Sequence, residues 1–173
     1  EIVVDPVSEN VEYYIEGKVV ADNAALEGVS VTAGEATATT DENGQYSLTV
    51  KDKKTYTVSF AKKGYRTVSG ASVEIAKNAT NKSLIALNVT MSKEGVPVTV
   101  NPEEETVITD KGEGEIKGAT SALIVPAGAV SATTDIALTP YWEVSAIYET
   151  PGVKKEAVAI LNIAITSSQD VAL

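Results

Sequence analysis

Short runs in which apolar and polar residues alternate make up most of this 173-residue chain. Such period-two patterns predict half-buried β-strands, because successive side chains of a strand point to opposite faces of the sheet. In the clearest run, one face carries Tyr46, Leu48 and Val50. Two strand-like runs flank Asp41-Glu42-Asn43-Gly44, and Asn-Gly tolerates the positive φ angles of a tight turn. Residues 39–50 therefore predict a β-hairpin whose apolar face needs a second sheet.

Similar runs fill the rest of the first half of the chain. A loop is expected at residues 22–27, and a turn at Gly64. The other predicted strands are residues 13–20, 28–33, 35–40, 55–61, 72–75 and 84–91. About seven short strands separated by turns are typical of a β-sandwich.

The second half continues the β pattern with different motifs. Glu94-Gly95 interrupts the strand pattern, and Pro97 cannot donate a hydrogen bond to a central ladder. The predicted strands of this half are residues 98–100, 106–109, 115–117, 122–125, 136–139, 144–148 and 158–166. We therefore predict an all-β chain with an N-terminal arm (residues 1–12) and two β-sandwich domains (residues 13–92 and 96–173), the second possibly incomplete.

Four motifs in the first half occur in the order and approximate spacing of a known family. They are Ile15-Glu16-Gly17-Lys18-Val19, Leu26-Glu27-Gly28-Val29-Ser30-Val31, Thr40-Asp41-Glu42-Asn43-Gly44-Gln45-Tyr46-Ser47-Leu48 and Tyr56-Thr57-Val58-Ser59-Phe60-Ala61-Lys62-Lys63-Gly64-Tyr65. Residues 13–92 resemble the carboxypeptidase regulatory-like domain. The resemblance implies a seven-stranded transthyretin-like sandwich, an accessory module common in secreted enzymes and bacterial surface proteins. It implies export to the cell surface, the outer membrane or the extracellular space.

A second resemblance covers about residues 115–140. Ala122-Leu123-Ile124-Val125-Pro126-Ala127-Gly128-Ala129-Val130, followed by Ile136-Ala137-Leu138-Thr139-Pro140, is similar to the spectrin-binding sandwich domain of ankyrins and netrin receptors. This resemblance implies a sandwich fold for the second half as well.

Composition narrows the chemistry that the chain can perform. The absence of histidine and cysteine removes Ser-His and Cys-His catalysis, disulfides and the two main zinc ligands. The net charge of −10 repels nucleic acid and anionic lipid. We expect no enzyme activity, no catalytic residue, no cofactor and no metal, and attachment to a membrane only through an anchor outside this sequence.

Tyr141 and Trp142 are the candidate binding residues. They are the only large aromatic residues that adjoin beside a proline, Pro140, and rings at the end of a sheet can stack on sugars or anchor a protein. The alternative is a packing role, because this is the only tryptophan in a chain with few aromatic residues.

Other polar motifs have simpler interpretations. Asp41, Asn43 and Gly44 resemble the start of a calcium loop but lack its distant glutamate, so a turn is favoured. The acidic residues Glu103, Glu104, Glu105, Asp110, Glu113 and Glu115 predict a solvated loop rather than a carboxylate pair for glycoside hydrolysis. Three glycosylation-type triplets begin at Asn78, Asn81 and Asn88, and the glycine-rich Lys111-Gly112-Glu113-Gly114 predicts a flexible loop.

The sequence thus indicates a non-catalytic binding or scaffolding module of an exported bacterial surface protein, with a glycan or protein as partner. Two alternatives remain open: accessory domains of a secreted enzyme whose catalytic part lies elsewhere, and a pore-forming β-protein, which alternation in residues 131–166 would also fit. Exposed edge strands would allow a dimer to form. Lysine and glutamate residues that block pairing between edges would give the same sequence pattern, so the oligomeric state stays open.

Overall fold

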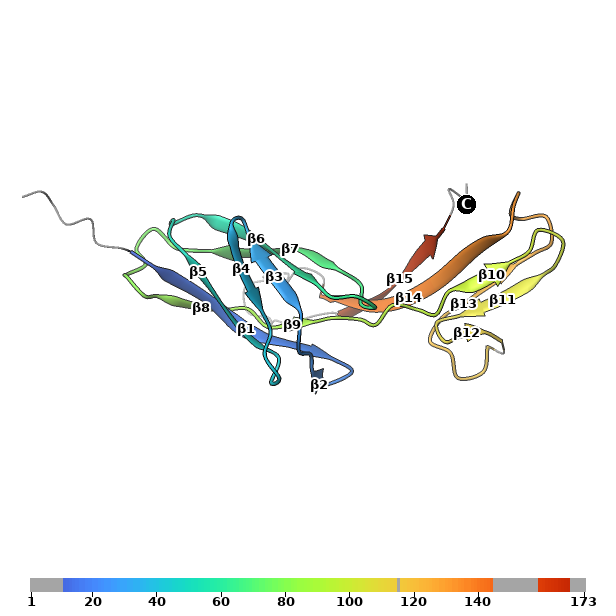
Figure 1. Cartoon of the computed structure of the whole chain (residues 1–173), viewed down its shortest axis with the longest axis horizontal. Helices are drawn as coiled ribbons and strands as arrows, with labels where there is room; N and C mark the ends of the chain where they lie inside the picture. Colours follow the sequence, from blue (N-terminus) through green and yellow to red (C-terminus); the bar gives the residue numbers. More distant parts are fainter. Residues whose placement is uncertain (1–10, 115, 145–158, 169–173) are drawn as a thin grey trace, which may run out of the picture. The chain divides into compact units, whose positions relative to one another are not determined.

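A computed structural model describes residues 11–114, 116–144 and 159–168, and within these ranges the chain consists of strands and turns without a helix (Figure 1). No helix in the described part is therefore long and apolar enough to span a membrane. The chain divides into two compact units, residues 1–91 and residues 92–173. The all-β prediction is confirmed. The predicted domain limits, 13–92 and 96–173, stay predictions, and the arm at residues 1–12 lies almost wholly outside the described residues.

Among its described residues, the first unit contains nine strands in two sheets. Seven of them have three or more residues, in agreement with the predicted seven-stranded sandwich. The strands are β1 (Tyr13–Ala21), β2 (Ala24–Ala25), β3 (Ser30–Ala33), β4 (Ala36–Thr39), β5 (Gln45–Val50), β6 (Thr55–Ala61), β7 (Val68–Glu74), β8 (Leu84–Ala86) and β9 (Val89–Thr90). One sheet is antiparallel in the order β4-β3-β6-β7. In the other, β1 pairs antiparallel with β2 and β5 and parallel with β8 and β9.

Alternate residues of these strands form the core between the two sheets. The β5 side chains Tyr46, Leu48 and Val50 are buried, while the residues between them are exposed. The Tyr46 ring meets the Phe60 ring of β6 edge-on at a centroid distance of 5.5 Å. Such edge-to-face contacts stabilise beyond the area that they bury. The inward face predicted for β5 is confirmed.

The predicted hairpin at residues 39–50 is wrong in its pairing. The turn is present: Gly44 has φ 73°, and its N–H donates to the Asp41 carbonyl at 2.9 Å. However, β4 pairs with β3 and β5 pairs with β1, so the two arms enter different sheets. An Asn-Gly turn reverses the chain but does not determine which strand each arm joins.

Three smaller corrections concern the first unit. Residues 22–27 do not form a plain loop, because Asp22 and Asn23, both with positive φ, make a tight turn from β1 into β2. The strand predicted at 72–75 is longer and begins at Val68. The strand predicted at 84–91 is divided into β8 and β9.

The second unit contains two three-stranded sheets among its described residues. Its strands are β10 (Val98–Val100), β11 (Thr106–Thr109), β12 (Gly112–Glu113), β13 (Ala122–Val125), β14 (Thr134–Val144) and β15 (Ala159–Ser167). The orders are β10-β14-β15 and β12-β11-β13, with every pair antiparallel. The core between the sheets comprises Val98, Val100, Ile108, Val125, Val130, Ile136 and Leu138.

The sequence located most of these strands but misplaced one. The strand predicted at residues 115–117 is wrong: the short strand is β12, while Ile116 and Lys117 lie in a bend and turn, and Glu115 lies outside the described residues. The strand at 136–139 extends in both directions into β14, through Pro140. Residues 145–148 and 158, which were predicted to be strand, lie outside the described residues.

The strands of the second unit differ greatly in length. β14 has 11 residues and β15 has 9, whereas β10 has 3 and β11 and β13 have 4 each. At about 3.3 Å per residue, β14 runs for roughly 36 Å and a four-residue strand for roughly 13 Å. The long pair β14–β15 therefore extends beyond the strands that pack on it.

Candidate functional site

The sole tryptophan lies on the extended part of β14. Trp142 and Tyr141 are neighbours in this strand, so their side chains point to opposite faces of the sheet. Trp142 is 66% exposed, whereas Tyr141 is partly buried. Among the described residues, Trp142 therefore presents most of its side chain to solvent, and its role as a binding residue stays a prediction.

Trp142 belongs to a continuous row of apolar side chains across β14 and β15. The register places Trp142 opposite Leu161, Pro140 opposite Ile163, and Leu138 opposite Ile165. Directly opposed residues of an antiparallel pair share a face, and so do alternate residues along a strand. We call the uncovered part of this face the apolar row: Pro140, Trp142, Leu161, Ile163 and Ile165.

The apolar row continues the core face of the unit beyond its cover. Ile136 and Leu138, on the same face of β14, are 2% and 1% exposed because they pack in the core with Ile108 and Val125. Further along, Leu161, Ile163 and Ile165 are 37%, 47% and 44% exposed. Leu161 and Ile163 lie further along the sheet than the short strands β11 and β13 reach, whereas Ile165, opposite the buried Leu138, is exposed because β15 is an edge strand.

The other face of β14 is covered where the row begins. Thr139 is 3% exposed, and its Oγ1 accepts a hydrogen bond of 3.0 Å from the Gly95 N–H. A Cβ on Gly95 would collide with the Leu138 backbone carbonyl, so only glycine allows this approach. This contact packs the Gly95 backbone on the face of β14 that is opposite to the apolar row.

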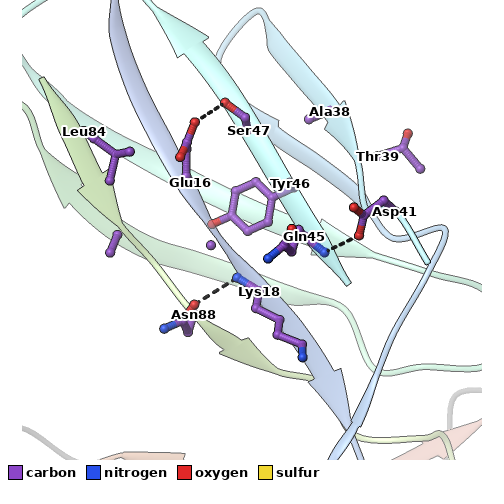
Figure 2. Close-up of a pocket in the computed structure, with 12 residues that line it drawn as sticks. Glu16, Lys18, Ala38, Thr39, Asp41, Gln45, Tyr46, Ser47, Leu84 and Asn88 are labelled. Carbon is purple, nitrogen blue, oxygen red and sulfur yellow. Dashed lines mark hydrogen bonds between the residues drawn. The ribbon is translucent and has the colours of Figure 1, made fainter. Parts of the chain in front are cut away.

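A second candidate site is a polar groove of about 590 Å³ in the first unit (Figure 2). Its lining includes outward side chains of β1, β5 and β8 and residues of β4. The polar groups are Glu16, Lys18, Asp41, Gln45, Ser47 and Asn88, and Leu84 adds an apolar edge that is 58% exposed. Cavities of this size hold small molecules in many proteins.

Hydrogen bonds organise the polar groove. Ser47 Oγ donates to Glu16 Oε1 at 2.9 Å, and the Lys18 N–H donates to Asn88 Oδ1 at 2.9 Å, as Figure 2 shows. Beneath them, the Tyr46 hydroxyl donates to the Leu87 carbonyl at 2.7 Å, and burial raises the pKa of Tyr46 to about 12. The floor of the groove is therefore a neutral phenol whose O–H group is bonded to a backbone carbonyl.

The interruption between β8 and β9 depends on a glycine of β1. The Leu87 N–H donates to the Glu16 carbonyl at 2.8 Å, and the Leu87 carbonyl lies where a Cβ on Gly17 would be. This close approach requires glycine and holds Leu87 for its bond with Tyr46. Sequence reasoning missed the groove, although the alternation of Glu16 with Lys18 and of Gln45 with Ser47 was a usable signal.

The other polar motifs have structural roles. Asp41 Oδ1 accepts the N–H groups of Asn43 and Gln45 at 2.9 and 2.8 Å, which stabilises the turn. Asn81 Oδ1 accepts a 2.9 Å hydrogen bond from the N–H of Glu12, the residue before β1. The part of the chain that the structure describes contains no cluster of three or more acidic side chains that could hold a metal ion.

The acidic region of the second unit does not form a carboxylate pair. Glu103, Glu104 and Glu105 are exposed in a turn, and Glu115 lies outside the described residues. Asp110 instead accepts the N–H groups of Thr120 and Ser121 at 2.8 and 3.0 Å. Burial pushes the pKa of Asp110 upward, but these hydrogen bonds and Lys111 outweigh it and lower the pKa. Asp110 thus supports the loop between β12 and β13.

Comparisons with known proteins bear on the first unit. Residues 14–92 match the family model of the carboxypeptidase regulatory-like domain, which confirms the resemblance found in the motifs. No curated protein matches the sequence.

Several solved structures are similar to this chain at low identity. A chain of a type II cohesin–X-dockerin complex from Acetivibrio cellulolyticus has 20% identity and a TM-score of 0.39, covering 49% of this chain and 60% of its own. A DUF3823 family protein from Parabacteroides merdae has 10% identity and a TM-score of 0.31, with 76% and 91% covered. A candidate carbohydrate-binding protein from Bacteroides uniformis has 10% identity and a TM-score of 0.32, with 90% and 97% covered. At these TM-scores the similarities carry no argument about function.

Proposed function

Because residues 14–92 form a carboxypeptidase regulatory-like domain, we propose that this chain is a non-catalytic binding module exported to the bacterial cell surface. Its contact surface is the apolar row of the second unit, and its partner is a protein. Export is supported by the surface and secreted proteins in which such domains are common.

The observation that carries the proposal is the exposure of Trp142 at the end of the apolar row. Tryptophan is enriched among the residues that dominate protein interfaces, and it contributes most when neighbouring side chains exclude water around it. Leu161 and Ile163 lie beside it and would form that surrounding area. Apart from the indole N–H of Trp142, the row offers no hydrogen-bonding side chain, so it suits a protein surface better than a sugar.

The proposal of a non-catalytic role is supported by composition. Without histidine or cysteine, the usual nucleophile pairs cannot be assembled. Among the carboxylates considered earlier, Asp110 accepts backbone hydrogen bonds in its own loop, and Glu103 is exposed to solvent. General acid–base catalysis would need a positioned group whose pKa lies near the working pH.

Site-specific crosslinking tests this function. A photoreactive phenylalanine derivative placed at position 142 should capture one dominant protein species in the cells that display the module. The same derivative at Leu84, which is also exposed but belongs to the first unit, is the matched control. Loss of the adduct when Ile163→Lys is added would assign the contact to the apolar row. Equal adduct patterns at both positions, or no adduct at 142, would refute the function.

A second candidate function is glycan binding in the polar groove. The observation that favours it is the combination of amide, hydroxyl and charged groups beside the apolar Leu84, since sugars present both hydroxyl groups and apolar faces. Calorimetry against a glycan panel should then show heat that Asn88→Ala and Gln45→Ala reduce and Trp142→Ala does not. Absence of heat with every glycan would remove this candidate.

A further inference from the structure

The polar groove of the first unit is built from side chains of three neighbouring strands (Figure 2). The register places Glu16 of β1 between Ala86 of β8 and Ser47 of β5. It also places Lys18 of β1 opposite Gln45 of β5. Directly opposed residues of paired strands share a face, so these side chains lie together on the outer face of the sheet. A ligand above Glu16 and Lys18 therefore has β5 side chains on one side and β8 side chains on the other.

Gln45 provides a side-chain amide whose hydrogen-bonding groups are unused. Its backbone N–H donates to Asp41 Oδ1 at 2.8 Å, and its backbone carbonyl accepts the Asp41 N–H at 2.9 Å, which fixes the residue at the start of β5. Within the described part of the chain, its exposed side chain has no hydrogen-bond partner. An amide offers a donor beside an acceptor in one plane. A planar group of the same kind, such as another amide, satisfies both at once.

Asn88 adds a donor of fixed direction on the other side of β1. Its Oδ1 accepts the Lys18 backbone N–H at 2.9 Å. Because an N–H donor must face the oxygen of an amide and not its nitrogen, this bond fixes the orientation of the Asn88 side chain. Its Nδ2 group has no partner among the described residues, and Asn88 lines the groove. This group can therefore donate to a carbonyl or hydroxyl oxygen of a ligand.

The β8 side of the groove is apolar. Leu84 is 58% exposed, and Ala86, two residues along the strand, is exposed on the same face. The described lining contains one aromatic residue, Tyr46, whose ring packs on Phe60 in the core. The groove therefore presents no ring on which a sugar would stack, and its apolar edge suits a small group such as a methyl.

We propose that the groove binds glycans that contain N-acetylated amino sugars. This inference rests on the second candidate function, glycan binding in the polar groove, and names the class of sugar. The acetamido group supplies the N–H and the carbonyl that Gln45 and Asn88 require, and its methyl group packs on the apolar edge of β8. Hydroxyl groups of the same sugar donate to the Glu16 carboxylate, which the 2.9 Å bond from Ser47 Oγ holds in place.

The charges of the groove disfavour acidic sugars. Glu16 and Asp41 contribute two carboxylates and Lys18 one ammonium group. Neither Glu16 nor Lys18 belongs to an ion pair within the described residues. An acidic sugar would bring its carboxylate to these groups in a chain of net charge −10. An acetamido group avoids this repulsion because it is uncharged, so the affinity should change little when salt is added.

Isothermal titration calorimetry of the whole chain tests the inference with two sugars that differ in one group per ring. N,N′,N″-triacetylchitotriose carries an acetamido group where cellotriose carries a hydroxyl. The acetylated trimer should bind at least about tenfold more tightly, because cellotriose leaves the Gln45 amide without its pair and the apolar edge uncovered.

Matched variants connect this preference to single residues. Gln45→Glu keeps nearly the same shape but loses the amide donor, and it should reduce the preference to about twofold or less. Asn88→Asp keeps the acceptor for the Lys18 N–H and loses the donor, so it should weaken binding of the acetylated trimer about fivefold or more. Thr49→Ala, on the same face of β5 but outside the groove lining, should change neither value. All three positions are exposed, and far-UV circular dichroism should match the wild type.

The outcomes separate this inference from the candidate function on which it rests. Equal affinity for the two trimers, heat only with glycans that lack acetamido groups, or a preference that survives Gln45→Glu would overturn the sugar class and retain glycan binding. Tighter binding of the deacetylated trimer would overturn it in favour of a cationic sugar. Tighter binding of N-acetyl-trialanine amide would assign the groove to a peptide. Absence of heat with every glycan would remove both the inference and the candidate function.

Discussion

Both units of this chain consist of strands in which apolar and polar residues alternate, but the two units bury the apolar faces of these strands to different extents. In the first unit the core contains 17 buried hydrophobic residues, with β5 and β6 buried along their whole inward faces. In the second unit the described core contains seven, and the inward face of β14–β15 continues uncovered into the apolar row. Alternation therefore predicts which residues share a face, whereas the lengths of the facing strands decide whether that face is buried or available for binding.

The largest effect should come from the first unit's core. Phe60→Ala removes a fully buried ring that packs on Tyr46, and we expect a loss of about 3–5 kcal/mol in the free energy of unfolding. Urea denaturation followed by circular dichroism measures it, with Phe60→Leu as the milder control. A loss below about 1 kcal/mol would show that this core is less tightly packed than the structure indicates.

Two isoleucines of the second unit test the contrast directly. Ile108→Ala, in the core between the sheets, should cost about 2–5 kcal/mol. Ile163→Ala, on the apolar row, should cost less than about 1 kcal/mol when measured on dilute protein. Thermal unfolding of both variants at low concentration gives the comparison. Equal losses would mean that the row is covered in the monomer.

The Tyr46 hydroxyl tests the floor of the polar groove. Tyr46→Phe leaves the Leu87 carbonyl without this donor, and we expect a loss of about 1.5 kcal/mol near neutral pH. Tyr14→Phe, whose hydroxyl donates to Glu12 near the surface, should change stability less than Tyr46→Phe does.

The raised pKa of Tyr46 predicts that the stability of the protein depends on pH in the alkaline range. Burial raises the Tyr46 pKa from 10.0 to about 12 in the folded protein. Its contribution to stability is therefore fully present below pH 10 and is lost as the pH rises through about 12. Ultraviolet titration of the tyrosinate absorbance should show a late-ionising group that is missing in Tyr46→Phe. An unchanged titration curve in that variant would contradict the assignment.

A smaller effect than at Tyr46 is expected at Asp110. Asp110→Asn weakens the acceptor for the Thr120 and Ser121 N–H groups and should cost about 1 kcal/mol at neutral pH. Because the pKa is lowered in the folded state, the carboxylate's contribution is present above the ordinary value of 3.8 and is lost as the pH falls. Melting temperatures of the two proteins should therefore converge in acid. A constant difference across pH would assign the loss to packing instead.

Local signals in the sequence predicted most of the strands correctly and some of their pairings incorrectly. Alternation identified the strands β5 and β6 and the inward face of β5, because the pleat of a strand alone places alternate residues on one face. The turn at Gly44 was predicted, but its assignment to a hairpin was wrong, since a turn signal does not specify the sheet that each arm enters. The short strand β12 was misplaced because two residues provide no period to detect.

The candidate site was only partly predictable. The adjacent aromatic residues pointed to Trp142, and alternation identified Leu161, Ile163 and Ile165 as one face of a strand. Their exposure could not be predicted, because it depends on the four-residue lengths of β11 and β13, which are distant in sequence, and on the edge position of β15 in its sheet. The polar groove likewise requires the division between β8 and β9, which the sequence shows only as one continuous run.

Acrylamide quenching of Trp142 tests the central claim most directly. In the Ile163→Lys variant, at a concentration where only monomer is present, quenching should approach that of free tryptophan and emission should lie at long wavelength, because two thirds of the side chain is exposed. Weak quenching with short-wavelength emission in that monomer would show that Trp142 is packed within the chain, and it would contradict the account of the apolar row as a binding surface.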